Sequence, residues 1–208
     1  MTLRNTLLAA AAGLVLSASA ANASIIATLN GITNSAAHPG AFDFSYSSTL
    51  AADEQIVTGS YLVLYDWGPA LTPLPTAATG LMATNFTFSQ QLSGPSPLVT
   101  VPTDSASVLN VVAVYGGSTV TGFGLGNGAN ANLGTFTLTS PLGSVNRAGL
   151  QGSLAQHFNP GNPSLTGTFD SNITTEVIPA ALVPEPASLA ILGGALALAG
   201  VVRRRRRA

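Results

Sequence analysis

The sequence contains no cysteine and no lysine, and charged residues make up only 7% of it. The absence of cysteine excludes disulfide bonds, thiolate metal ligands and cysteine nucleophiles. Typical globular proteins carry roughly 25% charged residues, so this chain holds apolar segments beyond an ordinary core. Two apolar runs, residues 7–16 and 187–202, supply much of the excess. We expect neither run to belong to the folded domain.

Basic residues are almost confined to the two ends of the chain. Between residues 24 and 180 the one basic residue is Arg147, and it stands against seven acidic residues: Asp43, Asp53, Glu54, Asp66, Asp104, Asp170 and Glu176. This central part is therefore acidic. Nucleic acid is excluded as a partner, because binding to phosphate backbones depends on lysine and arginine. Cations and neutral polymers remain as candidate partners.

The amino-terminal residues follow the pattern of a secretory signal peptide. Arg4 supplies a positive charge, residues 7–16 are apolar, and small residues follow. Small residues meet the cleavage rule at two places: Ala21 and Ala23 ahead of Ser24, which we favour, and Ala18 and Ala20 ahead of Ala21. We therefore predict a signal peptide over residues 1–23. An uncleaved anchor helix is the alternative, but the apolar run is shorter than the ~20 residues that span a bilayer.

The carboxyl-terminal residues form three parts in a fixed order. The first is a short box around two prolines: Val183, Pro184, Glu185, Pro186, Ala187 and Ser188. The prolines keep this box extended, within a linker over residues 179–186. Residues 187–202 form an apolar helix of roughly 24 Å, which local bilayer thinning can fit to a ~30 Å membrane. The third part resists translocation and stays cytoplasmic as a tail over residues 203–208: Arg203, Arg204, Arg205, Arg206 and Arg207.

This order of Pro-Glu-Pro box, apolar helix and arginine cluster resembles the PEP-CTERM sorting domain, whose tail is also catalogued as the C-terminal domain of some ice-binding proteins. The resemblance implies recognition by an exosortase, a membrane-embedded cysteine protease or transpeptidase that cuts near the box. It further implies that this chain is the substrate of such an enzyme. The alternative is a tail-anchored membrane protein with an incidental Pro-Glu-Pro sequence. The resemblance covers only the end of the chain and leaves the preceding domain open.

Residues 24–178 predict one all-β domain. Alternating apolar residues and frequent turn residues favour an antiparallel β-sandwich or jelly roll, flanked by the signal helix and the transmembrane helix. Within residues 41–47, Phe42, Phe44 and Tyr46 share one face. The run of residues 56–66 suits a central strand covered on both faces. The other expected strands are residues 24–29, 84–89, 108–115, 119–125, 135–139, 164–170 and 174–178.

Few residues are candidates for a catalytic or metal-binding role. His38 and His157 each stand beside turn residues, without the spacing of a metal or catalytic motif, so we expect both to be solvated. No Gly-x-Ser-x-Gly elbow occurs. Asp53 and Glu54 could form half of a glycosidase carboxylate pair, but a solvated turn is the preferred interpretation.

Three further patterns in the sequence have simple structural interpretations. The asparagine- and glycine-rich residues 126–132 could hold calcium but contain no carboxylate, so a turn or hairpin is favoured. Thr135, Thr137 and Thr139 form one threonine ladder, whereas an ice-binding surface repeats such a ladder many times. The sequons at Asn85 and Asn172 are assigned no role.

The sequence therefore predicts an exported, exosortase-sorted surface or extracellular-matrix protein of structural or adhesive type. We expect it to be non-enzymatic, with no cofactor or metal. It would pass through the general secretion machinery and be anchored transiently in the inner membrane, with exopolysaccharide as a candidate partner. The alternative is a carbohydrate-binding or glycan-active module, for which Tyr65, Trp67 and Tyr115 could offer stacking faces. Ice binding is the least favoured function.

Overall fold

A computed structural model of the protein describes residues 25–97, 102, 104–122, 130–158 and 166–180. The predicted signal peptide with Ser24 lies outside the described residues. The same is true of residues 181–208, with the sorting box, the predicted transmembrane helix and the arginines, and of residues 123–129. Within the described part, no helix is long and apolar enough to cross a membrane.

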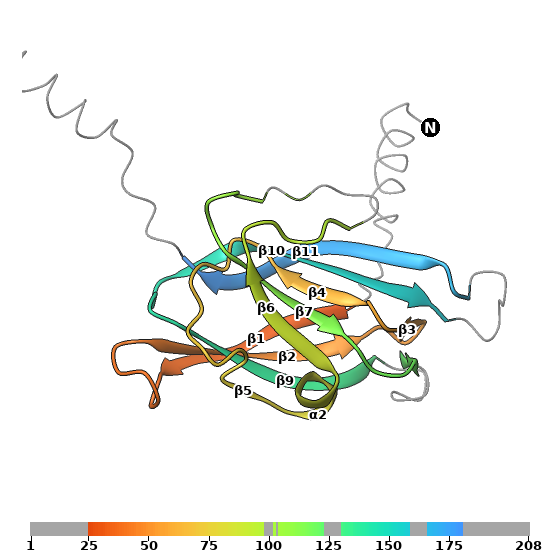
Figure 1. The fold of residues 1–208 in the computed structure, drawn as a ribbon, viewed down its shortest axis with the longest axis horizontal. Helices are drawn as coiled ribbons and strands as arrows, with labels where there is room; N and C mark the ends of the chain where they lie inside the picture. The colour runs from red at the N-terminus through yellow and green to blue at the C-terminus, as the bar shows by residue number, and fades with distance from the viewer. Residues whose placement is uncertain (1–24, 98–101, 103, 123–129, 159–165, 181–208) are drawn as a thin grey trace, which may run out of the picture.

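Two antiparallel sheets pack face to face and form a β-sandwich (Figure 1). The smaller sheet has the order β1 (Ile25–Asn34), β2 (Phe42–Leu50), β9 (Ala131–Ser140) and β5 (Ala77–Ala78). The larger sheet has the order β6 (Phe86–Gln91), β7 (Asn110–Tyr115), β4 (Tyr61–Leu64), β10 (Val145–His157), β3 (Glu54–Ile56) and β8 (Val120–Thr121), and β11 (Phe169–Pro179) pairs with β10. The prediction of an all-β antiparallel domain is confirmed.

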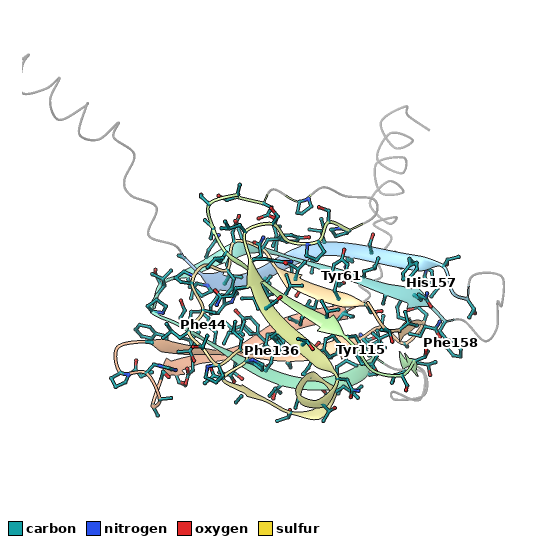
Figure 2. All side chains as sticks on the ribbon, in the orientation of Figure 1. Phe44, Tyr61, Tyr115, Phe136, His157 and Phe158 are labelled. Carbon is teal, nitrogen blue, oxygen red and sulfur yellow. The ribbon has the colours of Figure 1, made fainter. Side chains whose placement is uncertain are left out.

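The core between the sheets is rich in aromatic side chains. Phe44 and Phe136 lie between the two layers, and His157 lies near one end of the sandwich (Figure 2). Tyr46 stacks on Phe136 at 5.2 Å between ring centroids, and its hydroxyl donates a hydrogen bond of 2.8 Å to the Val177 carbonyl. Burial raises the pKa of this hydroxyl, which keeps the Tyr46 proton in place as a donor across the sandwich.

Polar side chains of the larger sheet cover the open edge of β1. Three backbone N–H groups of β1 have no partner in β2 and donate instead to side-chain oxygens. Ile25 bonds to Ser153 Oγ at 3.2 Å, and Ala27 bonds to Gln151 Oε1 at 3.0 Å. Leu29 bonds to the Glu176 carboxylate at 3.0 Å. The first strand is therefore fixed by residues of β10 and β11, and its amides are satisfied without a neighbouring strand.

A second, smaller apolar cluster lies on the outer face of the larger sheet. Its buried members are Tyr61, Val63, Tyr65 and Val112. The chain that follows β6 lies against this cluster, and the Tyr65 hydroxyl donates a 2.6 Å hydrogen bond to the Pro95 carbonyl. A Cβ atom on Gly94 would lie 2.8 Å from the Tyr65 ring. Glycine is therefore needed for this close approach.

The predicted central strand over residues 56–66 is wrong in its extent. The structure divides this region into β3 and β4, joined by a turn in which Gly59 has φ +92°. The Ser60 amide bonds to the Val57 carbonyl at 2.9 Å and closes the turn. Glycine readily adopts a positive φ. Both strands pair with β10 in the same direction, so this turn interrupts one line of strand and does not reverse the chain. Coverage on both faces is confirmed for Tyr61–Leu64, where all four residues are buried.

The longest strand, β10, is absent from the sequence-based prediction. Its inward face carries Gln151, Ser153 and Ala155 in place of large apolar residues, so its alternation gives no hydrophobic signal. The two strands predicted over residues 164–170 and 174–178 are instead one strand, β11, as far as the described residues show. Residues 80–84 form a short helix, α2 (Gly80–Thr84), directly ahead of β6.

Candidate functional site

Three ionisable side chains that are distant in the sequence meet at one end of the sandwich. Glu54 in β3 is the register partner of His157 at the end of β10. On the other side of β10, Asp170 of β11 pairs with Ala155, so it is the diagonal neighbour of His157 on the same face. Ile56, two residues after Glu54 in β3, belongs to the main core. This face is therefore the inward face of the larger sheet.

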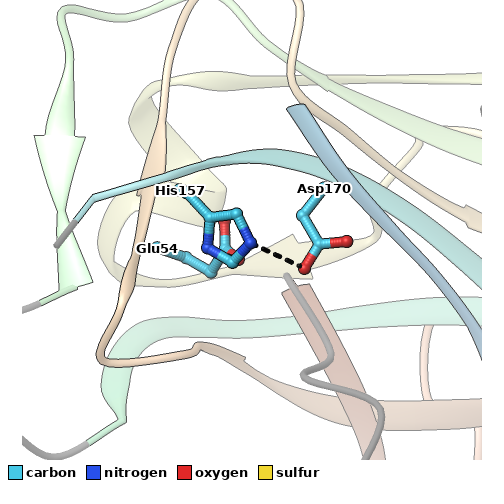
Figure 3. A group of neighbouring side chains, drawn as sticks. All are labelled: Glu54, His157 and Asp170. Carbon is cyan, nitrogen blue, oxygen red and sulfur yellow. Dashed lines mark ion pairs between the residues drawn. The ribbon is translucent and has the colours of Figure 1, made fainter. Parts of the chain in front are cut away.

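The imidazole of His157 lies between the two carboxylates (Figure 3). Its Nδ1 atom is 3.3 Å from Glu54 Oε1. Its Nε2 atom is 3.6 Å from Asp170 Oδ2. One ligand atom from each residue can be chosen so that all three atoms lie within 4.8 Å of one another. We name this group the Glu-His-Asp cluster.

Glu54 is the buried member of the cluster. Its side chain has 0% exposure, whereas those of His157 and Asp170 are 26% and 28% exposed. Neither Glu54 carboxylate oxygen has a hydrogen-bond partner among the described residues. Burial raises the pKa of the Glu54 carboxyl to about 8, and the negative charges of Asp170 and Asp53 add to the increase. The interior at this point therefore disfavours a free negative charge.

The structure corrects two sequence-based interpretations. Glu54 was expected in a solvated turn but lies in β3 with its side chain fully buried. His157 was expected in a solvated loop but ends β10 between two carboxylates. The sequence alone could not bring these residues together, because their contact depends on the pairing of β10, which the sequence did not reveal. Asp53 and His38 do not join the three-residue ligand group.

The Glu54 carboxyl makes the stability of the metal-free protein depend on pH. The folded protein holds this proton more tightly than the unfolded chain, whose carboxyl titrates near 4.5. The contribution of Glu54 to the free energy of unfolding therefore decreases as the pH rises from about 4.5 to about 8. Above about pH 8 this contribution no longer changes with pH. We expect Glu54→Gln to be more stable than the wild type at pH 8.5 by about 1 to 3 kcal/mol and to lose most of that advantage at pH 4.5.

Denaturant unfolding in the presence of a chelator at both pH values measures this difference. Comparing the two proteins at each pH removes the contributions of ionisable groups that are remote from residue 54 and present in both. Equal advantages of Glu54→Gln at the two pH values would contradict the prediction.

The aromatic residues proposed as stacking faces for sugars are buried. Tyr65, Trp67 and Tyr115 are each at most 1% exposed. The Trp67 indole packs edge-on against Phe44, with 5.7 Å between ring centroids, and Tyr115 packs against Phe86 at 5.2 Å. Trp67 and Tyr115 belong to the main core and Tyr65 to the outer-face cluster, so none of the three is exposed for stacking on a polysaccharide.

The threonine ladder of β9 is engaged in local hydrogen bonds. Thr135 Oγ1 is 2.8 Å from Thr79 Oγ1. The Thr139 hydroxyl donates to Asp43 at 2.6 Å and is 2.7 Å from Thr76 Oγ1. Two of the three hydroxyls in the ladder are thus bonded to neighbouring segments. This use of the hydroxyls favours a structural role for the ladder.

The end of β11 leads into the residues that decide where the protein is delivered. β11 ends at Pro179, and residues 182–207 match the PEP-CTERM protein-sorting motif. This chain carries a PEP-CTERM protein-sorting motif. The resemblance predicted from the Pro-Glu-Pro box, the apolar run and the arginines is confirmed.

A PEP-CTERM protein is exported, sorted by way of the membrane and processed by an exosortase. The motif matches the tail alone, so it assigns a destination and a processing enzyme to the β-sandwich without assigning it a ligand. No curated protein matches the chain.

Proposed function

We propose that this PEP-CTERM protein is a non-enzymatic structural or adhesive component of the cell envelope or extracellular matrix. The observation that carries the proposal is the sorting motif, whose match begins at residue 182, directly after the last strand of the sandwich at Pro179. Such a short connection makes the whole described domain the cargo of the sorting tail.

The composition and packing of the domain support this role. The aromatic residues considered as sugar-stacking faces, Tyr65, Trp67 and Tyr115, are buried. The Glu54 carboxyl is fully buried, so a large substrate has no direct access to it. The central part of the chain is acidic, which suits contact with cations and neutral polysaccharide better than contact with phosphate polymers.

Mature protein recovered from the producing cells tests the proposal. We expect it in the envelope or matrix fraction, with no turnover of glycoside, ester or peptide substrates. Deletion of the gene should weaken cell-to-cell or matrix cohesion, and complementation should restore it. Saturable hydrolysis that Glu54→Gln abolishes and Asp43→Asn leaves intact would replace the structural role with an enzymatic one. Specific retention on a glycan array would instead favour the carbohydrate-binding alternative.

A further inference from the structure

We infer that Glu54, His157 and Asp170 form a binding site for one divalent transition-metal ion of the zinc type. The donors are one imidazole nitrogen and two carboxylate oxygens, a set that suits Zn²⁺. The inference goes beyond the sorting function and does not depend on the structural role proposed for the domain.

The spacing of the first two donors fits a common ion. Two ligands with metal bonds of ~2.0–2.2 Å at a tetrahedral angle lie roughly 3.3–3.5 Å apart. Glu54 Oε1 and His157 Nδ1 are 3.3 Å apart. Asp170 can supply the third donor, because the three ligand atoms lie within 4.8 Å of one another. Its Oδ1 accepts a 2.8 Å hydrogen bond from the Ser171 amide, and its Oδ2 is the oxygen that faces His157.

Burial provides the second argument. A fully buried carboxylate normally has hydrogen-bond partners or a compensating charge. Neither oxygen of Glu54 has a hydrogen-bond partner among the described residues, although the side chain points toward His157 and Asp170 (Figure 3). A bound cation would compensate this carboxylate and the neighbouring Asp170 together. His157 and Asp170 are each about one-quarter exposed, which leaves the ion a route from solvent and room for a water ligand.

The donor atoms of the cluster also favour some metal ions over others. Calcium and magnesium prefer oxygen donors, and the imidazole shifts the preference toward zinc and similar transition metals. Soft-metal sites that depend on thiolates are excluded, because the chain has no cysteine. The site would offer three protein donors and keep at least one position for water.

Metal binding to the purified protein tests the inference. Protein treated with a chelator and repurified is titrated with Zn²⁺ by calorimetry, and with Co²⁺ by its visible absorption, which reports the coordination geometry. We expect about one Zn²⁺ per chain, a raised melting temperature on binding, and Co²⁺ bands typical of four- or five-coordination. Calcium should not displace the zinc.

Variants assign the binding to these residues. Glu54→Gln and Asp170→Asn should each weaken Zn²⁺ binding at least tenfold, in line with the loss of a ligand. Asp43→Asn removes one carboxylate charge elsewhere and should bind as the wild type does. The emission of the single tryptophan, buried Trp67, verifies folding. If Glu54→Gln fails to fold, the partly exposed Asp170→Asn decides alone.

Two results would overturn the inference. One is the absence of Zn²⁺ and Co²⁺ binding at millimolar metal. The other is binding that the Asp170→Asn substitution leaves unchanged, which would place the metal elsewhere on the acidic surface.

Discussion

Replacing Glu185 with alanine is expected to leave the full-length precursor in the membrane fraction. Glu185 stands between two prolines in the sequence and is the one charged residue of the sorting box, so we expect recognition by an exosortase to depend on it. Loss of this side chain should therefore block processing almost completely. Intact mass of the protein from the membrane and culture fractions measures the result, because the mass reports both ends of the mature chain.

The arginine cluster provides an independent test of the same tail. Removing residues 203–207 takes away the charges that resist translocation, so this variant should also escape normal processing. Leu198→Ile keeps the apolar run apolar and should be processed as the wild type is. Normal mature masses for both Glu185→Ala and the arginine deletion would show that exosortase sorting does not depend on these features.

Replacing Trp67 with alanine is expected to cost about 3 to 5 kcal/mol of the free energy of unfolding. The Trp67 side chain has 0% exposure and belongs to the main core. Its indole N–H donates a 3.1 Å hydrogen bond to the Tyr46 hydroxyl, which itself donates to Val177. The substitution therefore opens a cavity and removes one link of a chain of hydrogen bonds that joins β2 to β11.

Denaturant unfolding followed by circular dichroism measures this loss, since Trp67→Ala has no tryptophan fluorescence. Tyr46→Phe is the matched variant: it keeps the ring and removes only the hydroxyl, so it should cost about 1 to 3 kcal/mol. A loss below about 1 kcal/mol for Trp67→Ala would contradict the packing described for this core.

The sequence predicted the fold class because several strands show their burial by simple alternation. In β2, Phe44 and Tyr46 are buried and the intervening Ser45 is half-buried, as the pattern indicated. The inner face of β10 is different, because Gln151 and Ser153 are buried there to accept hydrogen bonds from the backbone of β1. In the sequence such a face is polar, and its burial can be recognised only when the distant strand that it contacts is known.

The Glu-His-Asp cluster was beyond sequence reasoning for a related reason. His157 and Glu54 become neighbours only through the register between β10 and β3, and Asp170 joins them through the register between β10 and β11. Each residue stands beside ordinary turn residues in the sequence. The sorting tail, in contrast, is recognisable because its three parts are contiguous and need no tertiary contact to be seen.

The covered edge of β1 determines when the exported domain can complete its folding. A chain exported from its amino end delivers β1 first, yet the side chains that cap its amides come from β10 and β11, more than 120 positions later. Contacts between such distant segments form late. The sandwich can close only after β11 has emerged, when the sorting motif that follows it is reaching the membrane. The edge of the first strand is therefore completed by the last strand to be delivered ahead of the sorting motif.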